Sequence, residues 1–271
     1  MTRHGSVPTK AREYCNKYVY SSCYKPVVPP IVNHRRDKSL LVGMELEVEL
    51  SINTDEARDE FTQVANDNFP KGLFYHTLDC TVRGVEMTSV PVTVNWLNAN
   101  REEINLGFEA LRKIGATVPH NCGGHIHASK AHITMADARK VLYLFATDFN
   151  SFYPICGRLN GLYQDLFYAD TRRGDDKPKI LKWCKGTRDI GRQVYSPRLR
   201  KVFKTSEFRV FGGTLHTDQL FSNVQLVDLI YRACKEVSNI EDLTWVNLME
   251  LAYTKTRSFT DMKRKLEAVC A

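Results

Sequence analysis

The chain has 271 residues, of which 43% are hydrophobic and 25% are charged, so it carries enough apolar material for a buried core. No apolar run reaches the length of a bilayer span, and the polar, basic N-terminus does not read as a secretory signal. These features predict a cytoplasmic protein with no membrane partner. The eight cysteines include no Cys-x-x-Cys pair, which indicates buried thiols rather than a disulfide framework.

The formal net charge of +7 is concentrated in two segments. Residues 1–38 hold eight Lys or Arg and two acids, and residues 171–209 hold thirteen and four. Several prolines and no regular period predict an irregular N-terminal arm at 1–38, followed by a single domain at 39–271. The positive charge of the arm suits it to bind nucleic acid or an acidic partner, whereas that of the second segment suits it to bind phosphate.

The first predicted strand spans Leu40 to Leu50 and alternates strictly after Gly43. One of its faces is a row of three glutamates, Glu45, Glu47 and Glu49. Like charges in one row destabilise a strand unless a cation lies over them, so the pattern favours a divalent metal. An acidic sheet edge that discourages aggregation is the alternative.

A hairpin is predicted next, with strands at 73–79 and 84–90. It places Asp79 near the turn and Glu86 on the returning strand. One helix is then expected from about Asn95 to Gly115, where the glycine ends it. This helix is expected to be scaffold.

The stretch from Cys122 to Ser129 predicts a strand that begins after two glycines. His125, His127 and Ser129 share one of its faces, where two imidazoles can converge on a cation or a phosphate. The alternative is a solvated face of an antiparallel sheet. A helix capped by Thr134 follows and is expected to end near Pro154.

The last predicted strand runs from Ser206 to Thr214, and helices follow it to the end of the chain. Glu207 and Arg209 share one face of this strand, and Phe208 points into the core. Such a pair is often only a surface ion pair. Here Gly212 and Gly213 follow directly, as they would where a ligand approaches the backbone.

Four predicted strands therefore carry carboxylate, imidazole or guanidinium groups. A sheet that turned their faces together would hold several metals with arginines for phosphate. Hard oxygen ligands favour magnesium or manganese. The chain has no glycine-rich phosphate loop of the usual kinds, so a nucleotide would be held through metal and arginine.

The four motifs, in this order, resemble those of the amidoligase family, the carboxylate–amine ligases of the glutamine synthetase superfamily. They are Gly43 to Glu47, Asp79 with Glu86 to Pro91, Cys122 to Ser129, and Glu207 to Thr214. The resemblance covers about residues 40–235. It implies an α+β fold, in which a curved antiparallel sheet of the glutamine synthetase catalytic type has helices packed on its outer face.

The resemblance also implies roles for individual residues. Five would be metal ligands: Glu45, Glu47, Glu86, His125 and Glu207. His127 and Ser129 would lie on the nucleotide side, and Glu86, Glu207 and Arg209 would be catalytic, with Arg209 stabilising the transferring phosphoryl group. The arginine that binds phosphate is left open among Arg158, Arg188, Arg192, Arg198 and Arg200.

The implied function is an amide ligase that uses ATP with Mg²⁺ or Mn²⁺ to join a carboxylate and an amine of an amino acid or peptide through an acyl phosphate. Nucleic acid is not expected as a partner of such an enzyme, and a homo-oligomer is left open. Two alternatives use the same residues or scaffold. One is a metal-dependent phosphoesterase or nuclease, and the other is a non-catalytic protein that binds nucleic acid or a virion.

Overall fold

The structure is a computed structural model that describes residues 18–19, 38–77, 82–156, 177–186, 195–196, 204–254 and 259–270. The chain divides into two compact units. Unit 1 comprises Met1–Gly124 and Gly213–Leu220, and unit 2 comprises His125–Gly212 and Phe221–Ala271. Each unit combines helices with strands that pair largely antiparallel, so the predicted α+β class is confirmed.

Unit 1 is built on the predicted hairpin. Strand β4 (Gly84–Ser89) pairs antiparallel with both β3 (Phe74–Thr77) and β2 (Leu41–Glu49), and β5 (Val92–Thr93) pairs with the start of β2. Strand β1 (Tyr18–Val19) adds to β3 in the parallel direction. These two residues lie within the arm predicted at 1–38, most of which lies outside the described residues.

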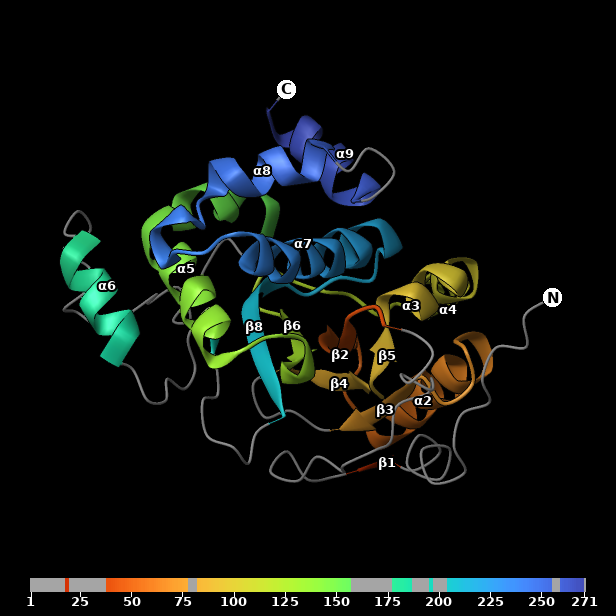
Figure 1. Ribbon diagram of the computed structural model, residues 1–271. Coiled ribbons are helices and arrows are strands. Elements are labelled where there is room, and N and C mark those ends of the chain that lie inside the picture. Colours follow the sequence, from red (N-terminus) through yellow and green to blue (C-terminus); the bar gives the residue numbers. More distant parts are fainter. Residues whose placement is uncertain are drawn as a thin grey trace. The chain divides into compact units, whose positions relative to one another are not determined.

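The helices of unit 1 are α2 (Asp55–Asn68), α3 (Val94–Ala99) and α4 (Arg101–Lys113). Helix α2 packs on β3 and on α4 (Figure 1), and the Phe61 ring lies edge-on to His76 at 5.6 Å between ring centroids. The single helix expected from Asn95 to Gly115 is wrong, because the chain leaves helical geometry at Asn100. The side chain of Asn100 donates to the Trp96 carbonyl oxygen at 2.7 Å and so competes with the helical backbone pattern.

Both faces of β2 are buried. Met44, Leu46 and Val48 lie in the core, as the alternation predicted. Glu45 and Glu47 on the other face are each only 7% exposed. The acidic face is therefore not a solvated edge, and the aggregation-blocking alternative is not supported for these two residues.

The strands of unit 2 are β6 (Gly123–Ser129), β8 (Thr205–Gly212) and β7 (Tyr195–Ser196), which neighbour one another in that order. The first two residues of β6 belong to unit 1. Strands β7 and β8 pair antiparallel, with Tyr195 opposite Phe208 and Ser196 opposite Glu207. The strands predicted at the His-x-His and Glu-x-Arg motifs are confirmed.

Helices surround these strands. Thr134 caps α5 (Met135–Cys156) by accepting the Asp137 backbone N–H at 3.1 Å, as the sequence predicted. Helix α5 packs on β7 and β8 (Figure 1) through a buried aromatic layer in which the Phe145 and Phe208 ring centroids are 6.1 Å apart. The other helical segments are η1 (Lys130–His132), α6 (Lys177–Gly186), α7 (Thr217–Glu236), η2 (Ile240–Asp242), α8 (Trp245–Thr254) and α9 (Thr260–Cys270).

The predicted buried thiols are confirmed where the structure describes them. No disulfide bond joins the described cysteine side chains Cys122, Cys156, Cys184 and Cys234, and all four are buried. Burial raises the pKa of Cys156 and of Cys184 to about 12, so these thiols stay protonated and unreactive at neutral pH. Among the described helices, none combines the length and apolar composition needed to cross a membrane.

Candidate functional site

Unit 1 supplies three buried carboxylates from two paired strands. Glu47 on β2 lies directly opposite Glu86 on β4, and Glu45 lies opposite Thr88. Because side chains alternate along a strand, all three glutamates share one face of the sheet. Glu86 is only 4% exposed. Directly opposed like charges on a buried sheet face are unfavourable unless something offsets them.

Neutral donors hold two of these carboxylates in place. The hydroxyl groups of Thr77 and Thr88 both donate to Oε1 of Glu86, at 3.2 and 3.0 Å. The backbone N–H of Gly123 donates to Oε2 of Glu47. These bonds give the two buried carboxylates hydrogen-bond partners that carry no positive charge.

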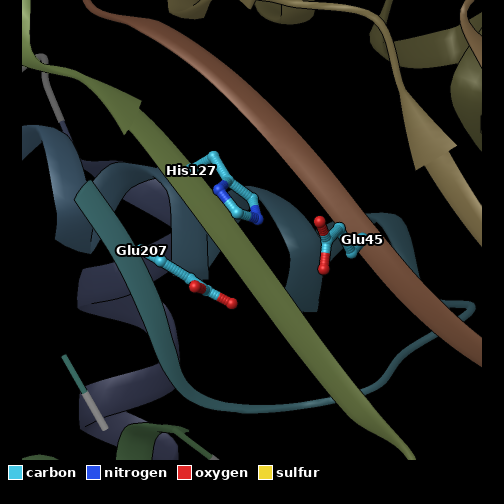
Figure 2. Close-up of side chains that lie close together, drawn as sticks. All are labelled: Glu45, His127 and Glu207. Atoms are coloured by element: carbon cyan, nitrogen blue, oxygen red, sulfur yellow. The ribbon is translucent and has the colours of Figure 1, made fainter. Parts of the chain in front are cut away.

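Unit 2 supplies imidazoles, a carboxylate and a guanidinium group. Glu207 on β8 is 3% exposed and accepts a hydrogen bond from Arg209 at 2.5 Å. Nδ1 of His125 lies 3.8 Å from Oε1 of Glu207. A ligand nitrogen of His127 and a carboxylate oxygen of Glu207 are within 4.8 Å of each other. Figure 2 shows these last two side chains, His127 on β6 and Glu207 on β8.

Between Glu207 and Arg209, the side chain of Phe208 anchors β8 in the core from the opposite side of the strand. Phe208 is fully buried, and its ring centroid lies 4.7 Å from that of Tyr195 on β7 and 5.9 Å from that of Tyr231 on α7. Burial raises the pKa of Tyr195 and of Tyr231 far above the ordinary phenol range. These phenols are therefore neutral core groups, and the ionisable chemistry is confined to the other face of the strand.

The structure distinguishes the two histidines of the His-x-His motif. His125 is 4% exposed and lies beside Glu207, whereas His127 is partly exposed and joins Glu207 as a candidate ligand. The sequence resemblance implied that His125 is a metal ligand and that His127 lies on the nucleotide side. The geometry favours His127 as the ligand among the described residues.

Ser129 has a local structural role. Its hydroxyl oxygen accepts the Ala131 backbone N–H at 3.2 Å and so caps η1. Several predicted positions lie outside the described residues: Asp79, Arg158, Arg188, Arg192, Arg198 and Arg200. Their roles therefore stay predictions.

Sequence reasoning missed the donors around the carboxylates, namely Thr77, Thr88 and the Gly123 amide. The two threonines could have been found from the hairpin register, because Thr77 pairs with Glu86 across β3 and β4 and Thr88 is two residues further along β4. Nothing in the sequence near Gly123 indicated that its amide would donate to a carboxylate.

Two comparisons with known proteins were negative. No family model matches the chain, and no curated protein matches it in sequence. The function must therefore be argued from the residues and the geometry alone.

Proposed function

We propose that the chain is an ATP-dependent carboxylate–amine ligase in which His127 and Glu207 hold one divalent cation, Mg²⁺ or Mn²⁺. Under this proposal the α+β fold is of the glutamine synthetase type. The observation that carries the proposal is the ligand pair of unit 2, His127 with Glu207, beside the guanidinium group of Arg209.

The chemistry of the residues supports such a cation. Glu207 offers a buried carboxylate oxygen, and His127 offers a ring nitrogen. Carboxylates with one imidazole suit Mn²⁺ well, and oxygen-rich sites with bound water suit Mg²⁺. The order of the four motifs along the chain supports the ligase class over other metal enzymes.

The proposed reaction has two steps. ATP supplies its γ-phosphoryl group to the substrate carboxylate, which gives an acyl phosphate and ADP. The substrate amine then attacks the acyl carbon, loses a proton and displaces phosphate, which leaves an amide. The bound cation would supply charge neutralisation at the phosphate oxygens.

The protein's own residues would act through position and charge. Arg209 would stabilise negative charge on the transferring phosphoryl group, and Glu207 would hold Arg209 in the orientation needed for this. Glu86 and its two threonine donors would fix the acidic face of unit 1. The buried setting would exclude water, which otherwise hydrolyses an acyl phosphate.

The test is a screen of amino acid and peptide pairs with ATP and Mg²⁺. The proposal predicts ADP and phosphate release only when a carboxylate and an amine are both present. Glu207→Gln should lose this activity while keeping the circular dichroism spectrum of the wild type. Glu250→Gln, at an exposed position on α8, is the matched control and should stay active.

Other outcomes of the same screen would contradict the ligase. Metal-dependent cleavage of a phosphodiester without ATP would instead establish the phosphoesterase or nuclease alternative. Salt-sensitive nucleic-acid binding that persists in Glu45→Gln, with no turnover of any substrate pair, would favour the non-catalytic alternative.

A further inference from the structure

The carboxylate of Glu47 has a partner that a metal ligand would not need. Its Oε2 atom accepts the backbone N–H of Gly123, the first residue of β6. Glu47 and Gly123 both lie in unit 1 and both are buried, so water cannot replace this bond. A bond between an amide and a carboxylate is charge-assisted and stronger than one between neutral groups.

The segment before β6 is fastened to β2 at a second point. Glu49 and Thr117 exchange two backbone hydrogen bonds, of 2.9 and 3.0 Å. Between these points the chain turns, with the Cys122 N–H donating to the Pro119 carbonyl oxygen. The bond from Gly123 to Glu47 therefore joins the end of this turn to β2, directly before the histidines of β6.

A third contact, made by Gly213, also fixes the start of β6. The Gly213 N–H donates to the Cys122 carbonyl oxygen at 2.9 Å. A Cβ atom at Gly213 would lie only 2.7 Å from Cγ1 of Val118 and 3.1 Å from the Gly123 carbonyl oxygen. The start of β6 is thus closely packed, and a shift of its first residue would be transmitted to His125 and His127.

We propose that Glu47 is a positioning residue, which sets the start of β6 and through it the placement of His127, rather than a ligand of the cation. This inference rests on the proposed metal site for its functional consequence. The required property of Glu47 is then an oxygen acceptor aimed at Gly123, and a negative charge is not required. A glutamine at this position keeps the acceptor, whereas an alanine removes it.

The experiment compares Glu47→Gln with Glu47→Ala in the full chain by two readouts. The first is hydrogen exchange of the Gly123 amide measured by NMR, and the second is Mn²⁺ affinity measured by titration calorimetry. Glu47→Gln should keep both within about threefold of wild type. Glu47→Ala should speed exchange at Gly123 and weaken Mn²⁺ binding, each by about tenfold or more, because a buried N–H loses its acceptor.

Two further variants serve as controls. Asn121→Ala removes the exposed side-chain bond of 3.3 Å from Asn121 to Glu49 in the same segment and should change neither readout. Glu207→Gln removes a proposed ligand and should abolish Mn²⁺ binding while leaving Gly123 exchange unchanged. Thermal unfolding of each variant shows whether it is folded.

The outcomes separate the two proposals. If the wild type binds no Mn²⁺, the proposed metal site fails, while Gly123 exchange still tests the acceptor role of Glu47. If Glu47→Gln keeps Gly123 protected but loses Mn²⁺ as fully as Glu207→Gln does, Glu47 is a ligand and the positioning role is overturned. If Glu47→Ala leaves Gly123 exchange unchanged, the positioning role is overturned as well.

Discussion

Both faces of the sheet formed by β2, β4 and β3 in unit 1 bury ionisable groups, but the two faces differ in the hydrogen-bond partners that they give to these groups. On one face, Glu47 and Glu86 are buried with amide and hydroxyl donors directed at them. On the other face, His76 lies in one row with Met87 and Leu46 and is 0% exposed. Neither ring nitrogen of His76 has a hydrogen-bond partner among the described residues.

The difference lies in the neighbours of the buried groups. Burial lowers the pKa of His76 to about 4, so its ring is neutral and behaves as a core side chain beside Phe61. The carboxylates of Glu47 and Glu86 instead accept hydrogen bonds from an amide and two hydroxyl groups. Polar side chains with directed donors therefore occur on one face, and an apolar environment surrounds His76 on the other.

The largest expected effect is a loss of packing on the apolar face. Leu46→Ala should lower the free energy of unfolding by about 2–5 kcal/mol, because Leu46 is only 2% exposed and a cavity would remain. Ile52→Ala, at a position 65% exposed, should change it by less than about 0.5 kcal/mol. Urea unfolding measures both. Equal losses in the two variants would show that the assigned core is wrong.

A second effect should appear in acid. The unfolded chain protonates His76 below its ordinary pKa of 6.5, whereas the folded chain does so only near 4. His76 therefore stabilises the fold fully above pH 6.5, and this contribution of roughly 3 kcal/mol is lost as the pH falls from 6.5 to 4. His76→Phe should flatten the pH dependence of the melting temperature in that window. An unchanged profile would mean that His76 is not buried in its neutral form.

A third effect concerns the pair His127 and Glu207 of unit 2. Mn²⁺ at about a hundredfold excess over its dissociation constant should stabilise the wild type by about 2.7 kcal/mol. Glu207→Gln should melt at the same temperature with and without the metal. Differential scanning calorimetry at fixed pH distinguishes these cases, and stabilisation of Glu207→Gln by Mn²⁺ would place the ion elsewhere.

The smallest expected effect comes from the donors to Glu86. Thr88→Val keeps the shape of the side chain but removes one of two hydroxyl donors to Oε1 of Glu86. The unfolding free energy should fall by about 1 kcal/mol. Thr77→Val should behave similarly, and the double variant should lose more than either alone. No loss in the double variant would mean that these hydroxyl groups do not support the carboxylate.

Much of the fold could be predicted from local pattern. The alternation in β2, β6 and β8 identified the strands and both their faces, because a buried strand face requires apolar residues at every second position. Thr134 marked the start of α5 correctly, since its side chain and that of Asp137 satisfy each other's backbone N–H groups. These features depend on residues close together in the sequence.

Other features depend on contacts between distant residues and could not be predicted. An apolar periodicity that continues through Asn100 concealed the break between α3 and α4 at this residue. The bond from Gly123 to Glu47 joins residues 76 positions apart. The nearness of His125 and His127 to Glu207 likewise depends on the neighbouring strand rather than on the motif.

The central claim is that His127 and Glu207 of unit 2 bind the same cation. Electron paramagnetic resonance titration with Mn²⁺ tests it directly in the wild type, His127→Ala, Glu207→Gln and the double variant. The account predicts one tightly bound Mn²⁺ per chain, which either single substitution removes, with no further loss in the double variant. A tightly bound Mn²⁺ that survives either single substitution would contradict it.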